Sequence, residues 1–152
     1  MFQALRLEAL ERHPEAFASS FEEERNRSLD AVAERIPEQP PAIIFGAFAG
    51  ERLVGMAGFY QQSHLKARHR GNLWGMYVQS GWRGQGVGEA LVRAVIEHAR
   101  GFVEFVELTV VVDNHPAVKL YDRLGFTPYG VQQAALRIGD RDYDEALLAL
   151  RL

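Results

Sequence analysis

The stretch from Met76 to Gly88 constrains the fold of this chain more than any other part of the sequence. It begins as the end of an apolar, β-prone run that closes at Val78, which predicts a strand. Gly84, Gly86 and Gly88 follow, and glycine adopts backbone conformations that residues with a Cβ resist. An amphipathic helix is predicted directly after them. Unpaired N–H groups at the positive end of a helix dipole bind anions, so we expect a phosphate or diphosphate site here.

Two familiar phosphate-binding loops differ from this stretch in spacing. A dinucleotide fingerprint, Gly-x-Gly-x-x-Gly, counted from Gly84 would need its last glycine at Glu89. A P-loop would need a Gly-Lys-Ser/Thr ending, which the stretch lacks. The spacing present is Arg-x-x-Gly-x-Gly, formed by Arg83, Gly86 and Gly88. Taken alone, this motif is also compatible with a turn that binds nothing, because glycine-rich turns are common between strands and helices.

A second block of residues follows a predicted strand at 106–112. It reads Asn-x-x-Ala-x-x-Leu-Tyr-x-x-x-Gly-Phe and runs from Asn114 to Phe126. The two blocks, in this order and separation, resemble the GCN5-related N-acetyltransferase superfamily, in which the first block grips coenzyme A. The resemblance extends from about Arg6 to the C-terminus, so it covers nearly the whole chain.

The resemblance implies acetyl-CoA as co-substrate and indicates which residues would bind it. Backbone groups of Met76 and Val78 would hold the pantetheine arm where the strands at 71–79 and 104–112 splay apart. Asn114 is predicted to cap the following helix, since Pro116 suits its first turn, and the resemblance adds a contact with pantetheine. The N–H groups that would bind the diphosphate belong to Arg83, Gly84, Gln85, Gly86, Val87 and Gly88. The Arg83 side chain either joins them or faces solvent.

Tyr121 is the candidate general acid, because the resemblance implies a tyrosine near the thioester sulfur that can protonate the leaving thiolate. The alternative is a core aromatic residue on an amphipathic helix. A general base is harder to assign, since Trp74 and Gly75 occupy the strand positions where many relatives carry a carboxylate. The remaining candidates are a water, no base at all, or one of Glu22, Glu23 and Glu24.

The acceptor side of the site has weaker candidates. Glu22 and Glu23 could attract a cationic amine, although acidic residues in a first helical turn also complement the helix dipole. Trp74 could line an acceptor pocket or could pack in the core. Tyr143, with Asp144 beside it, is a further candidate for the border of this pocket. His64 and His69 lack a convincing third ligand, so no metal site is predicted.

The predicted fold is a single α+β domain spanning residues 1–152, with helices on a mixed, mostly antiparallel sheet. One parallel junction is expected between the strands at 71–79 and 104–112, because a helix connects them by a right-handed crossover. Helices are predicted at 2–12, 21–36, 86–100 and 115–124. Strands are predicted at 42–49, 52–61, 71–79, 104–112, 126–138 and 143–152.

The first edge strand of the superfamily fold is missing from this sequence, which starts inside the first predicted helix. Either the start codon lies further upstream, or the fold has one strand fewer. In the second case the strand at 42–49 has an unpaired edge, and exposed edges recruit partners. We therefore expect this edge to be covered by a loop, by residues outside this sequence or by another chain, as in a homodimer.

Composition narrows the function further. The chain has no cysteine, so acyl transfer would be direct or would use another nucleophile. Its net charge of −3 disfavours non-specific nucleic-acid binding. Neither a membrane span nor a signal peptide is apparent, which predicts a cytoplasmic protein. The expected function is acetyl transfer from acetyl-CoA to a primary amine of a small molecule or peptide. The alternative is an acyl-CoA-binding module without catalysis.

Overall fold

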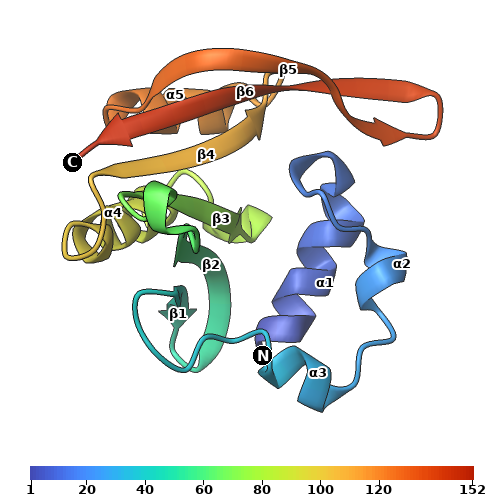
Figure 1. Ribbon diagram of the computed structural model, residues 1–152. Coiled ribbons are helices and arrows are strands. Elements are labelled where there is room, and N and C mark those ends of the chain that lie inside the picture. The colour runs from blue at the N-terminus through green and yellow to red at the C-terminus, as the bar shows by residue number, and fades with distance from the viewer.

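The computed structural model describes all 152 residues and contains one six-stranded sheet with the order β1-β2-β3-β4-β6-β5 (Figure 1). All neighbouring strands pair antiparallel except β3 and β4, which are parallel. The predicted fold class is therefore confirmed. The strands are β1 (Ile43–Ala49), β2 (Arg52–Gln61), β3 (Arg70–Val78), β4 (Phe105–Val111), β5 (Thr127–Ile138) and β6 (Arg141–Arg151).

The α-helices are α1 (Phe2–Arg12), α2 (Phe21–Glu24), α3 (Leu29–Ala33), α4 (Val87–Ala99) and α5 (His115–Arg123). Three 3-10 helices accompany them, η1 (Pro14–Ala16), η2 (Leu65–Ala67) and η3 (Ser80–Trp82). None of the helices is long and apolar enough to span a bilayer.

The single helix predicted at 21–36 is wrong, because this segment forms the two short helices α2 and α3. Ser28 starts the second helix by accepting a hydrogen bond from the N–H of Ala31. No apolar residue lies between Phe21 and Leu29, so a continuous helix would have no side to bury there. Leu29 is 82% exposed and Ile36 is exposed as well, so neither anchors the segment in the core.

Helices cover both faces of the sheet. Successive residues of a strand point to opposite faces, so Met56 and Tyr77 pack against α1 while Ala57 and Val78 belong to the cluster around α4. The α4 cluster is the larger one and also includes Tyr121 of α5. In Figure 1, α1 to α3 lie beside the β1–β2–β3 half, and the long β5–β6 hairpin extends past the end of α1.

The sheet divides between β3 and β4. These strands pair only from Arg70–Phe105 to Asn72–Glu107, after which they diverge. A bulge in β3 adds to the divergence, because Gly75 and Met76 together oppose one residue of β2 and Gly75 has a φ of +63°. Bulges bend a strand and increase its twist. The C-terminal half of β3 is thus left without a partner on the β4 side.

The outer edge of β1 carries no further strand, since β1 pairs with β2 alone. Phe48 is 59% exposed near this edge. Within the residues of this chain, the sheet therefore ends at β1. Coverage of the edge by a second copy or by other residues stays a prediction.

A buried ion pair joins α1 to α2. Glu24 is fully buried, and its carboxylate accepts hydrogen bonds from Arg6 Nε at 3.3 Å and Arg6 Nη2 at 3.1 Å. Arg35 approaches the same carboxylate at 3.4 Å. Desolvation alone would raise the pKa of Glu24, but the hydrogen bonds and charge of Arg6, with Arg35, lower it below its ordinary value.

Candidate functional site

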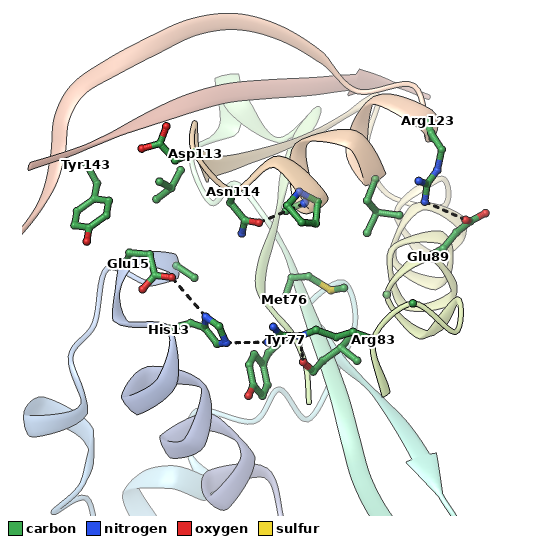
Figure 2. Close-up of a pocket in the computed structure, with 18 of the residues that line it drawn as sticks. His13, Glu15, Met76, Tyr77, Arg83, Glu89, Asp113, Asn114, Arg123 and Tyr143 are labelled. Atoms are coloured by element: carbon green, nitrogen blue, oxygen red, sulfur yellow. Dashed lines mark hydrogen bonds and ion pairs between the residues drawn. The ribbon is translucent and has the colours of Figure 1, made fainter. Parts of the chain in front are cut away.

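A cleft of about 990 Å³ opens where β3 and β4 diverge (Figure 2). One wall is formed by the end of β3, the following loop and the start of α4. The opposite wall comes from the β4–α5 junction and β6, and the segment from His13 to Ala16 closes one end. The parallel junction that the sequence predicts is therefore also the place where the molecule is hollowed.

The loop from Gly84 to Glu89 lies along this cleft with its N–H groups unused. No N–H from Gly84 to Glu89 donates a hydrogen bond to the backbone, and the first to do so is that of Ala90, which bonds the carbonyl of Gly86 at 3.0 Å. Gly84 and Gly86 have φ angles of +71° and +82°, with open space where a Cβ would be. This arrangement places several unbonded donors at the N-terminus of α4, and such an arrangement favours anions.

Gly88 has a different role in the same loop. A Cβ added there would lie 3.1 Å from Cε of Met76 and 3.5 Å from Cδ2 of Leu120. The glycine therefore lets the first turn of α4 approach β3 and α5 closely.

The exposed Arg83 side chain lies along the β3 side of the cleft. Its Nε donates to the carbonyl oxygen of Val78 at 2.8 Å, and its Nη2 lies 3.0 Å from Nε2 of His13. The guanidinium also lies over the Tyr77 ring, 5.6 Å from the centroid. Figure 2 shows this side chain between β3 and the end of α1.

Most of the residues predicted for the cofactor line this cleft. Asn114 caps α5 as expected, with its Oδ1 accepting from the N–H of Ala117 at 3.4 Å. Gln85 and Val87 are absent from the lining, and the Gln85 side chain instead donates to the carbonyl of Gly81. The predicted residues that line it are Met76, Val78, Arg83, Gly84, Gly86, Gly88 and Asn114. Their contacts with a cofactor stay predictions.

Tyr121 lies behind the cleft wall. It is 5% exposed and packs edge-on against Phe126, while its helix neighbours Ala117 and Leu120 line the cleft. Its hydroxyl has no hydrogen-bond partner in the chain. The hydroxyl oxygen is not fully enclosed by protein atoms. Burial raises the pKa of Tyr121 far above that of an ordinary tyrosine, so the phenol is protonated at neutral pH. Its role as the acid stays a prediction.

The acceptor-side candidates Glu22, Glu23 and Trp74 do not line the cleft. Glu23 completes a capping box with Ser20, and the hydrogen bonds from Ser20 lower the pKa of its carboxyl. Trp74 lies across Gly58 of the neighbouring strand, where a Cβ would collide with the indole. Of the weaker candidates, Tyr143 lines the cleft and Asp144 does not.

The cleft contains residues that the sequence did not single out, above all His13 and Glu15. Nδ1 of His13 lies 3.5 Å from Oε1 of Glu15, and both side chains are about one-third exposed. Across from them, Arg141 of β6 lies 3.9 Å from Asp113 and over the ring of Tyr143. The only local signal was His13-Pro14, which predicts the end of a helix and nothing of its chemistry.

Tyr77 forms part of the cleft wall rather than a free reactive group. Its hydroxyl donates to Oε1 of Glu8 at 3.1 Å, and Gln79 Nε2 donates to the other oxygen at 2.7 Å. Burial first, and then the hydrogen bond with Glu8, raise the pKa of Tyr77. The ring is thus anchored to α1 with its proton retained.

Comparison with known proteins agrees with this geometry. The model of the acetyltransferase (GNAT) family matches residues 5–126. The L-amino acid N-acetyltransferase AaaT of Escherichia coli is 34% identical over 115 residues, covering 70% of this chain and 67% of that protein. The N-alpha-acetyltransferase RimI of Mycobacterium tuberculosis is 31% identical over 97 residues, covering 64% of this chain and 60% of that protein.

Among solved structures, a GCN5-related N-acetyltransferase from Kribbella flavida superimposes with a TM-score of 0.82 at 23% identity, covering 99% of this chain and 89% of that one. The chain therefore belongs to the acetyltransferase (GNAT) family, and the expected enzyme class, an acetyl-CoA-dependent acyltransferase, is confirmed at the level of the family. The chain spans from 26% to 67% of the lengths of three of its curated relatives.

Proposed function

We propose that this chain transfers an acetyl group from acetyl-CoA to a primary amine of a small molecule or peptide. The observation that carries the proposal is the run of unbonded N–H groups from Gly84 to Glu89 at the N-terminus of α4. Donors in this position favour the diphosphate of coenzyme A through hydrogen bonds and the helix dipole together. The cleft beside them leaves room for the rest of the cofactor.

The pantetheine arm would follow the gap between β3 and β4, next to Met76 and Val78. The thioester would then lie toward the middle of the cleft, with α5 on one side. In this position the hydroxyl of Tyr121, which is protonated at neutral pH and has no hydrogen-bond partner in the chain, would protonate the leaving thiolate. Fixing acceptor and thioester in one cleft supplies the positional part of the catalysis.

The acceptor would enter at the end formed by His13, Glu15, Asp113, Arg141 and Tyr143. Carboxylates here attract a cationic amine, and Arg141 offers a partner for a carboxylate. The names of two relatives, an L-amino acid N-acetyltransferase and an N-alpha-acetyltransferase, place the amine on an amino acid or a polypeptide in those proteins. An α-amino group is therefore the first acceptor to test.

The proposal is tested by mixing the protein with acetyl-CoA and a panel of amino acids, short peptides and polyamines, and following free thiol. Thiol release that depends on one class of amine is the expected result.

The second candidate, a binding module without catalysis, is favoured by the absence of a carboxylate on β3. It would bind acetyl-CoA without releasing thiol with any amine.

Tyr121→Phe is expected to lower kcat about 100-fold, because general acid catalysis contributes roughly 10²–10⁴-fold. The dissociation constant for acetyl-CoA should stay within about twofold, since the ring and its packing against Phe126 are retained. Steady-state kinetics and calorimetry measure the two quantities. Tyr129→Phe on exposed β5 is the control. An unchanged kcat for the Tyr121 variant would exclude the role of acid.

A further inference from the structure

Three side chains form a continuous polar chain across one end of the cleft. Glu15 Oε1 lies 3.5 Å from His13 Nδ1, and His13 Nε2 lies 3.0 Å from Arg83 Nη2 (Figure 2). Arg83 in turn donates through Nε to the carbonyl of Val78. Because Arg83 also belongs to the loop that starts the diphosphate site, this chain joins the cofactor end of the cleft to the acceptor end.

The contact with Arg83 defines the tautomer of His13. A guanidinium only donates hydrogen bonds, so Nε2 of the imidazole must accept and carry a lone pair. The ring proton then lies on Nδ1, on the side of the Glu15 carboxylate. A histidine with one nitrogen oriented by a carboxylate and the other presenting a lone pair has the arrangement of a general base.

The other groups of the cleft are unsuited to this task. Tyr77 donates its proton to Glu8, and Glu89 lies 3.7 Å from Arg123. Asp113 faces Arg141. The charged and titratable groups around His13 are Glu8 and Arg12 of α1, Glu15 of η1, Tyr77 of β3, Arg83 of the loop, Asp113 of the β4–α5 junction, and Arg141 and Tyr143 of β6.

We propose that His13 is the general base of the transfer and that Arg83 covers its Nε2 until the diphosphate of the cofactor draws the guanidinium away. This inference rests on the proposed function and adds that the cofactor must bind before the acceptor can react. In the free protein the lone pair is occupied, so the acceptor amine meets no base. Once the cofactor is bound, the same arginine binds the anion and Nε2 becomes available to the acceptor.

The chemistry balances with one proton released. Nε2 of His13 takes a proton from the acceptor ammonium, and the nitrogen lone pair then forms a bond with the thioester carbon. The C–S bond breaks as the Tyr121 hydroxyl gives its proton to the thiolate, and the second proton of the attacking nitrogen restores the Tyr121 phenol. The products are the amide, free coenzyme A and one proton, which the imidazolium returns to solvent.

His13→Gln tests the assignment, because the glutamine oxygen can still accept from Arg83 but cannot serve as a base. We expect kcat to fall at least about 100-fold, with the dissociation constant for acetyl-CoA within about twofold of wild type. The acid limb of the profile of log kcat/KM against pH should disappear. His64→Gln, on an exposed loop outside the cleft, is the matched control and should retain kcat and the profile.

His13→Ala provides a second test, which distinguishes a base from a residue with only a structural role. Added imidazole should restore part of kcat in this variant, in proportion to its neutral fraction. Glu15→Gln should lower kcat by roughly tenfold through loss of orientation while keeping the acid limb.

The state of Nε2 can be measured directly in the wild-type chain by ¹H–¹⁵N NMR of its five imidazoles. In the free protein, His13 should be protonated on Nδ1 with Nε2 accepting a hydrogen bond. Adding coenzyme A should shift the Nε2 resonance toward that of a free lone pair, whereas His64 should not change.

Each outcome decides the proposal. His13→Gln with wild-type kcat and an intact acid limb would overturn the base assignment while leaving the acetyltransferase activity in place. A ring proton found on Nε2 of His13 in the free protein would overturn the pairing with Arg83. If the wild-type chain binds acetyl-CoA but releases thiol with no amine, the proposed function fails and the base assignment fails with it.

Discussion

Gly86→Asp should weaken binding of acetyl-CoA at least about 100-fold, which corresponds to roughly 2.8 kcal/mol. Gly86 has a φ of +82° and is the N-cap of α4, with nothing within 4 Å of the position a Cβ would take. The new carboxylate would lie among the unbonded N–H groups of the loop and bind them in place of the diphosphate. Two like unit charges about 4 Å apart near a protein surface repel by about 4 kcal/mol. This repulsion is large enough to account for the expected loss of binding free energy.

Gly50→Asp is the control for backbone strain. Gly50 lies in the β1–β2 turn with a φ of +60° and also has open space at the Cβ position. Both variants should therefore lose similar stability, by about 1–2 kcal/mol for a side chain in the left-handed region, while only the first loses cofactor binding. Calorimetric titration with acetyl-CoA and thermal unfolding measure the two effects. Equal affinities for both variants would show that the loop does not bind the cofactor.

Glu24→Ala is expected to cost about 3–5 kcal/mol of unfolding free energy, because it leaves a buried guanidinium without its partner. Glu24 is fully buried, and the Arg6 side chain is 7% exposed. One nitrogen of that arginine, Nη1, already lacks a hydrogen-bond partner. Chemical denaturation measures the change. Glu22→Ala, an exposed residue of the same helix, should change stability by less than about 0.5 kcal/mol.

The stability that Glu24 contributes should also depend on pH. Its pKa in the folded chain is lowered from an ordinary value of 4.5, so the folded state holds its proton less tightly than the unfolded state. The contribution is therefore complete above about pH 4.5 and is lost as pH falls through the lower, folded pKa. The difference in unfolding free energy between Glu24→Gln and the wild-type chain should therefore become smaller in that acidic range. A difference that stays constant from pH 7 to pH 3 would contradict the ion pair.

The cofactor side of the cleft could be predicted from the sequence because its signals are local. Gly86 and Gly88 define the turn and the close packing of α4, and Asn114 followed by Pro116 defines the start of α5. Such motifs depend on residues a few positions apart, so the predicted helix boundaries fall within a residue or two of those observed.

The acceptor side could not be predicted in the same way. His13 is far from both Asp113 and Arg141 in the sequence. Only the tertiary fold brings the three residues to one cleft. Glu22 and Glu23 were chosen for their charge, but the capping box and the short length of α2 direct them elsewhere. Trp74 was chosen for its position on β3, and its side chain packs across Gly58. Charge and strand position alone do not specify which cavity a side chain meets.

The central claim, that the Gly84–Glu89 loop binds the diphosphate of coenzyme A, is tested most directly by calorimetric titration of the wild-type chain. Acetyl-CoA, coenzyme A and pantetheine, which lacks the diphosphate, are compared at one ionic strength. The account predicts one site for both coenzyme A species and at least about 100-fold weaker binding of pantetheine. Binding of pantetheine as tight as that of coenzyme A, or no heat with any of the three, would contradict it.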